Sequence, residues 1–435
     1  MALGLWLVRG VYSIILVFLL PGIFFRLWRR GARLPAYRHR WAERLGCHVL
    51  PVLQETLWVH AVSVGEAVSA IQLINCFMTA HPQATVVFTT TTPTGSDRVK
   101  AAFKDKLGKN LWHCYFPYDL PWIWRRFLKQ IHPKVLVLME TEIWPNLLHA
   151  CEQHKIPVLI ANARLSPRSA QHYGWLGGLM ADIMRPVSTI AAQSPLDAER
   201  FAAIGVPSTK IHMIGNIKFD LPVDPTVVQA GQDLRHALGT HRRVWIAAST
   251  HAGEELIILN VYQALKKTFP HLLLLLVPRH PDRFNQVADL CVSQGVMMVR
   301  RSDKLPCSDQ TDVFLGDTMG EMNLFYAASD IAFVGGSFVP VGGHNLLEPA
   351  ALNLPVLTGP HLFNFLAISA LLIQAGGAQV VADQAALTQA MTTLLQDPKR
   401  GVSQGTAGRQ AVEENRGAMN KLLHLVMELW ETKRK

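Results

Sequence analysis

The sequence predicts an α/β protein with two domains, each built around a parallel β-sheet that is covered by helices. Three observations support this prediction. The chain has 435 residues, which is more than one ordinary hydrophobic core accommodates. Continuous runs of Val, Ile and Leu, typical of strands buried in parallel sheets, alternate with helical patterns. This alternation stops at a polar stretch with two prolines, residues 219–233, and then restarts.

The first element in chain order is an apolar segment. Residues 11–25 carry no charge, and from residue 2 onward only Arg9 interrupts the apolar run. About 20 apolar residues are enough to span a bilayer. A cleaved signal peptide requires a small-residue cleavage site, and none follows the run. The remaining alternative is a buried core helix, because the strictly uncharged part is short.

The next segment is strongly basic. It contains seven arginines and a single acidic residue, Glu43. Trp6, Trp28 and Trp41 suit the interface between a membrane and water. Arginine is enriched on the cytoplasmic side of membrane segments. We therefore expect residues 1–25 to form a membrane anchor, spanning or deeply embedded, with the rest of the chain on the cytoplasmic face. The arginines are Arg26, Arg29, Arg30, Arg33, Arg38, Arg40 and Arg44.

The predicted strands fall into two sets, one on each side of the polar stretch. Helical patterns such as Glu66–Ala80 and Leu196–Ile204 separate the strands of the first set. The first set covers residues 56–62, 84–92, 134–140, 157–163, 189–194 and 210–216. The second set covers residues 243–250, 271–278, 296–300, 313–317, 331–336, 354–359 and 378–383.

The polar stretch sets the domain boundaries. We place the domains at residues 26–221 and 222–407, with a hinge near residue 222. A C-terminal helix, from Gly408 to about Trp430, closes the chain within residues 408–435. In open α/β sheets, ligands bind at the carboxyl ends of the strands, so we expect the sites there and in the cleft between the domains.

Composition limits the classes of function. The net charge of +10 indicates an anionic partner, which is nucleic acid, membrane headgroups or a phosphorylated substrate. Six cysteines are scattered without a C-x-x-C pair, which argues against a disulfide framework and against a zinc site. The chain lacks a P-loop, a dinucleotide fingerprint after its first strand and an H-E-x-x-H motif. ATPase, simple dehydrogenase and zinc hydrolase functions therefore lose their usual support.

Charged residues follow three strands of the first set. Glu66, in "HAVSVGE", opens a helix, where it either caps the helix or serves as a general base. Glu140 and Glu142, in "METEIWPN", alternate along an extended segment, so they point in opposite directions and at most one faces a substrate. The alternative for this pair is a structural ion pair with an arginine. Lys218, in "GNIKFD", either overhangs the cleft or is simply solvated.

Polar loops also follow strands of the second set. "VPRHPDRF" ends an apolar strand with Arg279 and His280, and "GDTMGEM" is a loop of small and acidic residues. In "GGHNLLEPAA", Pro349 is tolerated only in a first turn, so a helix begins near Asn345–Leu346. Its free N–H groups form an anion site, and Glu348 accepts hydrogen bonds from sugar hydroxyls. This pattern indicates a nucleotide pocket, with a capped helix after a tight turn as the alternative.

Together these motifs resemble the 3-deoxy-D-manno-octulosonic acid (Kdo) transferases of Gram-negative lipid A assembly. The resemblance implies a GT-B fold of two Rossmann-like domains facing a central cleft, preceded by an N-terminal anchor at the inner membrane. It implies inverting transfer of Kdo from CMP-Kdo to a tetraacylated disaccharide lipid A precursor, without a metal ion, a cofactor or nucleic acid. The matching motifs cover essentially the whole chain: "HAVSVGE", "TTTTPTGSDRV", "METEIWPN", "ANARLSPRS", "GNIKFD", "LGDTMGEM" and "FVGGSFVPVGGHNLLEPA".

The resemblance also implies roles for individual residues. The catalytic base of the family falls on Glu66, and its charge-stabilising residues fall on Glu140 and Lys218, with the choice of Glu140 over Glu142 left open. The positions that bind CMP fall in three groups after strands of the second set. They are Pro278 and Arg279; Met319, Gly320 and Glu321; and Asn345, Leu346, Leu347 and Glu348.

Three other functions compete with this interpretation. One is a glycosyltransferase that uses UDP-sugars on a lipid acceptor. The second is a nucleotide-sugar epimerase, which has no need for a membrane anchor. The third is a lipid- or nucleic-acid-binding module, which does not account for the carboxylates at the strand ends.

Overall fold

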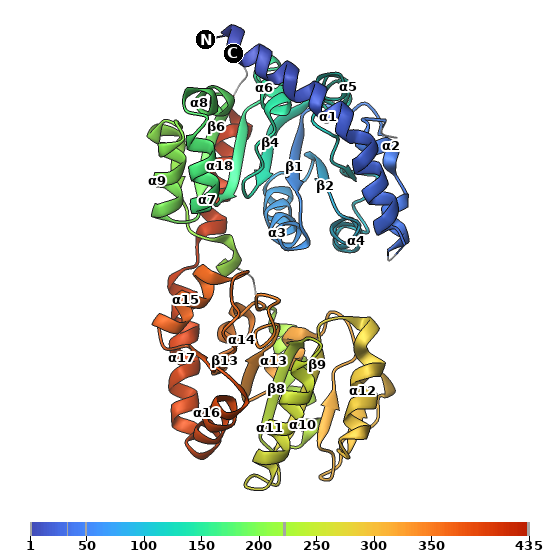
Figure 1. Ribbon diagram of the computed structural model, residues 1–435, viewed down its shortest axis with the longest axis vertical. Coiled ribbons are helices and arrows are strands. Elements are labelled where there is room, and N and C mark those ends of the chain that lie inside the picture. The colour runs from blue at the N-terminus through green and yellow to red at the C-terminus, as the bar shows by residue number, and fades with distance from the viewer. Residues whose placement is uncertain (1, 33, 48–49, 221–222, 433–435) are drawn as a thin grey trace. The chain divides into compact units, whose positions relative to one another are not determined.

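Two parallel sheets of seven strands form the framework of the chain, each in its own unit of the computed structural model (Figure 1). The structure describes residues 2–32, 34–47, 50–220 and 223–432. Unit 1 comprises residues 1–220 and 416–435, and unit 2 comprises residues 221–415. The predicted α/β class with two parallel sheets is therefore confirmed. The expected hinge near residue 222 and the side chain of Arg33 lie outside the described residues.

The sheet of unit 1 has the strand order β3-β2-β1-β4-β5-β6-β7. Side chains of β1 alternate between its faces, so Leu57 and Val59 join one core and Trp58 joins the other. Helices α3, α4 and α18 pack on the first face, and α5, α6, α8 and α9 on the second. The strands are β1 (Thr56–Ala61), β2 (Thr85–Thr90), β3 (Leu111–Tyr115), β4 (Pro133–Met139), β5 (Val158–Ala163), β6 (Val187–Ala192) and β7 (Ile211–Met213). The helices are α1 (Ala2–Arg30), α2 (Trp41–Arg44), α3 (Val64–Ala80), α4 (Pro93–Ala102), α5 (Pro121–Ile131), α6 (Pro145–Gln153), α7 (Pro167–Gly174), α8 (Gly178–Met184), α9 (Pro195–Ala203) and α18 (Ala418–Glu431).

Strand β3 is missing from the predicted set. It lacks the Val, Ile and Leu run of its neighbours and carries His113 at its centre. Nε2 of His113 lies 3.0 Å from Oγ1 of Thr90, and burial lowers the pKa of His113 to about 3. A neutral, hydrogen-bonded histidine thus takes a place where the sequence pattern requires an apolar residue.

The sheet of unit 2 has the strand order β10-β11-β9-β8-β12-β13-β14, and each of its strands overlaps a predicted one. The strands are β8 (Val244–Thr250), β9 (Leu273–Pro278), β10 (Met298–Arg300), β11 (Val313–Leu315), β12 (Ile331–Val334), β13 (Val356–Thr358) and β14 (Ala378–Val380). The helices are α10 (Pro225–Leu238), α11 (Glu254–Lys266), α12 (Phe284–Ser293), α13 (Met322–Ala327), α14 (Leu347–Ala351), α15 (Leu366–Gln374), α16 (Gln384–Gln396) and α17 (Pro398–Glu414).

The single C-terminal helix expected from Gly408 to about Trp430 is wrong. Helix α17 ends in unit 2 and α18 begins in unit 1. Between them Gly417 has a φ of 99°, which non-glycine residues rarely adopt. The carboxylate of Asp220 accepts hydrogen bonds from the N–H groups of Gly417 (2.6 Å) and Met419 (2.7 Å) and so caps α18. The chain therefore returns to unit 1 for its last helix.

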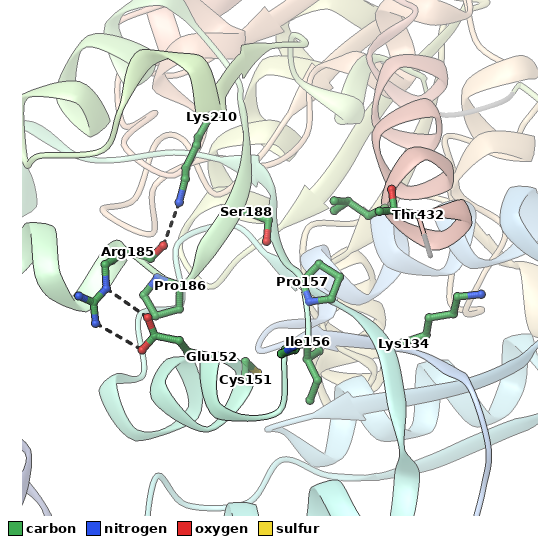
Figure 2. Close-up of a pocket in the computed structure, with 12 residues that line it drawn as sticks. Lys134, Cys151, Glu152, Ile156, Pro157, Arg185, Pro186, Ser188, Lys210 and Thr432 are labelled. Carbon is green, nitrogen blue, oxygen red and sulfur yellow. Dashed lines mark hydrogen bonds and ion pairs between the residues drawn. The ribbon is translucent and has the colours of Figure 1, made fainter. Parts of the chain in front are cut away.

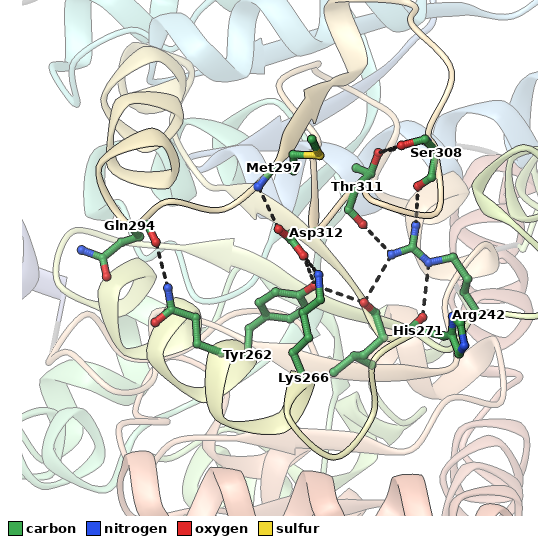
Figure 3. A network of polar contacts seen from close by, with 11 residues as sticks. Arg242, Tyr262, Lys266, His271, Gln294, Met297, Ser308, Thr311 and Asp312 are labelled. Atoms are coloured by element: carbon green, nitrogen blue, oxygen red, sulfur yellow. Dashed lines mark hydrogen bonds and ion pairs between the residues drawn. The ribbon is translucent and has the colours of Figure 1, made fainter.

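A buried arginine holds together the loops that lead into the sheet of unit 2 (Figure 3). Arg242 lies two residues before the start of β8 and is 2% exposed. Its guanidinium donates to four backbone carbonyls in the segments before β9 and β11, so it cross-links the amino ends of three strands. The carbonyls belong to His271, Leu272, Ser308 and Thr311.

Candidate active site

Glu66 lies in the first turn of α3, directly after β1. Its carboxylate accepts hydrogen bonds from the backbone N–H groups of Val62 (2.7 Å) and Ser63 (3.3 Å). Oγ of Ser63 in turn accepts from the N–H of Glu66 at 3.2 Å. This capping box satisfies backbone donors at the start of the helix, so the structural role raised by the sequence is real. It also fixes the carboxylate at the carboxyl end of β1.

Burial and a neighbouring carboxylate raise the pKa of Glu66. The residue is 9% exposed, and burial raises its pKa. The hydrogen bonds from Val62 and Ser63 oppose this rise, whereas the negative charge of Glu140 adds to it. Proton transfer at neutral pH is most efficient when the pKa of the base lies near the working pH. The arrangement therefore equips Glu66 to accept a proton.

Glu140 and Lys218 lie together although 78 residues separate them in the chain. Nζ of Lys218 is 3.4 Å from Oε1 of Glu140. Glu140 directly follows β4, next to β1 in the sheet, and Lys218 belongs to the 3-10 turn Ile217–Asp220. The structure thus brings Glu66, Glu140 and Lys218 to one edge of the sheet of unit 1. The ion pair of Glu140 is formed with a lysine, not with the arginine that the alternative required.

A buried asparagine positions the turn that carries Lys218. Asn162 lies in β5 with a φ of 53°, and its Oδ1 accepts the N–H of Ile217 at 3.2 Å. The N–H of Lys218 itself donates to Oδ1 of Asn216 at 3.0 Å. Sequence reasoning missed Asn162, although a polar residue inside the apolar run "PVLIANA" was the available signal.

The expectation that Glu140 and Glu142 point in opposite directions is wrong. Residues two apart in an extended segment lie on the same face, so this spacing did not support opposite directions, and the φ of 58° at Glu140 departs from an extended strand in any case. Both carboxylates lie within electrostatic reach of Glu66. Burial, aided by the charges of Glu66 and Glu140, raises the pKa of Glu142 to about 7. Three carboxylates therefore interact at this edge, and only Glu140 pairs with Lys218.

In unit 2 a buried glutamate shapes the loop after β12. Glu254 opens α11 and is completely buried. Its carboxylate accepts the N–H groups of Gly336 (2.7 Å), Ser337 (3.0 Å) and Phe338 (2.9 Å), and also that of His251 (2.9 Å). Sequence reasoning missed this residue. The signal was the Gly-Glu step in "STHAGEE", which repeats the step of "SVGE" at the same place after a first strand.

Three histidines gather above the carboxyl ends of β8, β9 and β12. Nε2 of His251 lies 2.8 Å from Nε2 of His344, and the ring of His280 lies edge-on to that of His251. Burial, together with the positive charge of Arg279, lowers the pKa of His344 to about 4. At neutral pH the His251–His344 contact is therefore an N–H···N hydrogen bond between two neutral rings. Among the described residues, no group of His, Cys, Asp or Glu side chains could hold a metal ion.

The predicted nucleotide stretch lies beside this cluster and differs from expectation in one respect. Helix α14 begins at Leu347, has five residues, and contains Pro349 in its first turn as predicted. However, the N–H of Leu347 donates to Oδ1 of Asn345 at 3.1 Å, so this amide is not free for an anion. Nδ2 of Asn345 donates to Glu348 at 3.1 Å. Burial raises the pKa of Glu348, and Arg279 is near enough to oppose that rise.

The third predicted group, Met319 to Glu321, follows β11, which neighbours β9. Gly320 has a φ of 86°, as a tight turn requires. Arg301 donates to both oxygens of Glu321 (2.7 and 3.1 Å), and this pairing lowers the pKa of Glu321. Glu321 also lines a pocket of 740 Å³ beside the loop. The structure thus places Glu321 at the predicted edge but gives it an arginine as its partner.

A separate pocket of 410 Å³ lies at the opposite, amino edge of the sheet of unit 1 (Figure 2). Its charged side chains bind groups of the chain itself. Arg185 pairs with Glu152 at 3.1 Å, and Nζ of Lys210 donates to the carbonyls of Arg185 (2.8 Å) and Val187 (2.7 Å). These contacts account for the polar groups there, and we do not assign the chemistry to this pocket.

Comparison with known proteins gives a consistent result across nearly the whole chain. A profile of the family described as 3-Deoxy-D-manno-octulosonic-acid transferase (kdotransferase) matches residues 39–221. A 3-deoxy-D-manno-octulosonic acid transferase of Haemophilus influenzae is 43% identical, with 96% of this chain and 98% of the relative covered. The corresponding transferase of Bordetella pertussis is 34% identical, with 97% and 99% covered.

The fold also has solved counterparts. A UDP-GlcNAc 2-epimerase from Neisseria meningitidis, bound to UDP-GlcNAc, matches with a TM-score of 0.58 and 15% identity. The match covers 86% of this chain and 100% of that one. At this identity the likeness shows the fold alone, and it confirms the predicted two-domain α/β architecture of the GT-B type.

Proposed function

The chain belongs to the 3-deoxy-D-manno-octulosonic acid (Kdo) transferase family, and on that premise we propose that it transfers Kdo from CMP-Kdo to the tetraacylated lipid A precursor, lipid IVA. Family membership makes the chain a glycosyltransferase of lipopolysaccharide biosynthesis. The epimerase and binding-module alternatives are therefore set aside. The donor, the acceptor, inversion at the anomeric carbon and the residue roles below belong to the proposal. So does a location at the cytoplasmic face of the inner membrane, where a lipid acceptor is available.

The observation that carries the proposal is the grouping of Glu66, Glu140 and Lys218 at one sheet edge. Glu66 takes the proton from the attacking acceptor hydroxyl. The hydroxyl oxygen then bonds to the anomeric carbon of Kdo while the bond from that carbon to the phosphate oxygen of CMP breaks. CMP leaves with the bonding electron pair, and a single displacement inverts the anomeric centre.

The Lys218–Glu140 pair suits the charges of this donor. Kdo carries a carboxylate on its anomeric carbon, and positive charge develops on the sugar ring as the bond to CMP breaks. Lys218 pairs with the donor carboxylate, and Glu140 balances the ring charge. Charged groups that are fixed before the reaction stabilise a transition state without reorganisation, which is their main advantage over water.

Unit 2 provides the groups for the leaving nucleotide. Arg279 is exposed at the end of β9, and its charge influences the pKa values of both His344 and Glu348. We assign the CMP phosphate to Arg279 and to an N–H of the His251–His344 pair. Glu348, held by Asn345, accepts hydrogen bonds from the ribose. Pro278, Met319, Gly320, Glu321, Leu346 and Leu347 complete the proposed CMP site.

The capping box offers a matched pair of variants to test the base. Glu66→Gln keeps an oxygen that accepts the N–H of Val62, because Gln also serves in capping boxes, but it cannot take a proton. Glu66→Ala loses both functions. We expect both variants to abolish transfer, measured as the mass gain of lipid IVA by one or more Kdo units, and both to bind CMP as the wild type does. Only Glu66→Ala should lose thermal stability, by about 1 kcal/mol.

Two outcomes would contradict the proposal. Turnover retained by Glu66→Gln would remove Glu66 from the base role. Transfer from UDP-sugars in place of CMP-Kdo, measured with the same acceptor, would overturn the donor.

A further inference from the structure

The N-terminal helix α1 is docked along one side of unit 1 instead of projecting from it (Figure 1). Its less exposed residues recur every three or four positions, so they form one stripe along the helix. Arg9, Tyr12, Ser13 and Phe24 of this stripe contact the rest of unit 1. The members of the stripe are Leu5, Arg9, Tyr12, Ser13, Leu16, Leu20, Ile23, Phe24 and Leu27.

Polar contacts hold the first half of this stripe. Nε of Arg9 donates to Oδ1 of Asn146 (3.3 Å), and Nδ2 of Asn146 donates to Oγ of Ser13 (2.9 Å). Tyr12 hydrogen-bonds to the carboxylate of Asp119, which also accepts the N–H of Asn146 at 3.1 Å. Asn146 and Asp119 are both buried. Arg9, the charged residue that interrupts the apolar run, is thus part of the contact between α1 and the rest of unit 1.

Aromatic contacts hold the second half. The ring of Phe24 packs against those of Trp41 (centroids 5.1 Å apart) and Tyr118 (5.8 Å). Farther along, Arg38 lies over the ring of Trp28 and donates to its carbonyl at 3.2 Å. A helix that crossed the bilayer surrounded by lipid would have to break these contacts, and Arg9 would no longer donate to Oδ1 of Asn146.

The opposite side of α1 is an exposed apolar stripe. It extends over much of a helix of 29 residues, which is about 43 Å long. Exposed apolar patches of this extent mark interaction sites. The stripe ends at three exposed arginines, Arg26, Arg29 and Arg30, which match anionic headgroups. Its largest members are Trp6, Leu7, Ile14, Ile15, Phe18, Leu19 and Phe25.

We propose that α1 lies in the plane of an anionic bilayer, with its docked stripe on unit 1 and its exposed stripe in the acyl chains of one leaflet. Length and composition alone would allow α1 to cross a membrane. The contacts of residues 9–13 and 24–28 with the rest of unit 1 instead hold α1 against this unit. The inference rests on the proposed membrane location and specifies the orientation of α1 at the membrane.

Protease accessibility tests the orientation of the helix. The full chain with an N-terminal epitope tag is expressed in a Gram-negative host, and spheroplasts and inverted inner-membrane vesicles are treated with protease. We expect cleavage of the tag in inverted vesicles only, because an in-plane helix keeps both ends on the cytoplasmic side. Cleavage in intact spheroplasts would mean that the helix crosses the bilayer, and this result would overturn the inference.

Flotation with phosphatidylglycerol-containing vesicles tests the surface itself. Phe18 is 80% exposed at the centre of the stripe, so Phe18→Glu should leave the fold intact and weaken vesicle binding at least 10-fold. Val292→Glu is the control, because Val292 is a 69% exposed apolar residue of unit 2, and we expect wild-type binding. Equal binding by wild type and Phe18→Glu would overturn the proposal. Dimers that form without vesicles and are abolished by Phe18→Glu would also overturn it, in favour of a second copy on the stripe.

These readouts are independent of the transfer reaction. A chain that binds vesicles in the plane but transfers no Kdo would refute the proposed function and leave this inference intact. A chain that transfers Kdo but exposes its tag on the periplasmic side would refute the in-plane orientation of α1 and leave the proposed function intact.

Discussion

Replacing Lys218 by Met separates a catalytic charge from a structural ion pair. The pair with Glu140 spans 3.4 Å, and the two side chains are 29% and 32% exposed. Partly exposed pairs of this kind contribute only about 0.2–1 kcal/mol to stability. A charge that stabilises a transition state contributes about 3–4 kcal/mol, or roughly 10²–10³-fold in kcat. We therefore expect Lys218→Met to lower kcat at least 100-fold and the free energy of unfolding by no more than about 1 kcal/mol.

The assay measures Kdo transfer to lipid IVA at saturating CMP-Kdo, together with urea denaturation of the same preparations. Arg185→Met is the matched control, because Arg185 forms an ion pair of 3.1 Å with Glu152 at the opposite edge of the same sheet. This variant should retain wild-type kcat with a similarly small change in stability. A decrease in kcat below about fivefold for Lys218→Met, the equivalent of roughly 1 kcal/mol, would refute the electrostatic role. A loss of stability well above that figure would show that the pair is structural.

Three further predictions concern pKa values and stability. Glu140→Gln removes a negative charge that raises the pKa of Glu66, so the pKa of Glu66 falls, and the acid limb of the residual kcat/KM profile should move to lower pH; an unchanged limb contradicts the coupling. Burial lowers the pKa of His60 to about 3. As the pH falls below 6.5, His60 therefore binds a proton in the unfolded state but not in the folded state. The free energy of unfolding should consequently fall by about 2 kcal/mol by pH 5. His60→Gln should remove this part of the pH dependence in urea titrations, and an identical slope in both proteins contradicts the assignment. Arg242→Met leaves buried carbonyls without a donor and should destabilise unit 2 by about 2–6 kcal/mol. The measurement is hydrogen exchange, which should become faster in the strands of unit 2. As the control, Arg243→Met replaces a half-exposed arginine and should change stability by less than about 1 kcal/mol.

Local patterns were enough to predict most of the framework. Each strand of unit 2 overlaps a predicted run, because a strand buried on both faces needs continuous Val, Ile and Leu. The failures have local causes. Strand β3 was missed because half-buried, neutral His113 replaces an apolar residue. The break at Gly417 was missed because the apolar periodicity resumes directly after it.

The site depended on contacts that no local pattern encodes. The left-handed backbone of Glu140 was not predictable, since Asn and Gly are the residues that usually adopt it. Asp220 meets the start of α18 across 197 residues, and His251 meets His344 across 93. Sequence motifs could therefore name the residues at the strand ends, but only packing determines that Glu140 pairs with Lys218.

The two units use the same Gly-Glu step after their first strands, and the difference between them bears on the chemistry. Glu254 is completely buried, and four N–H groups occupy its carboxylate, so it can only hold the loop after β12. Glu66 caps its helix with two such bonds, stays 9% exposed, and lies within reach of the charge of Glu140. At Glu66 two hydrogen bonds are opposed by burial and by a like charge, and this balance leaves its carboxylate able to take a proton. The same local motif thus holds a loop in unit 2, and in unit 1 it positions the carboxylate that we propose as the base.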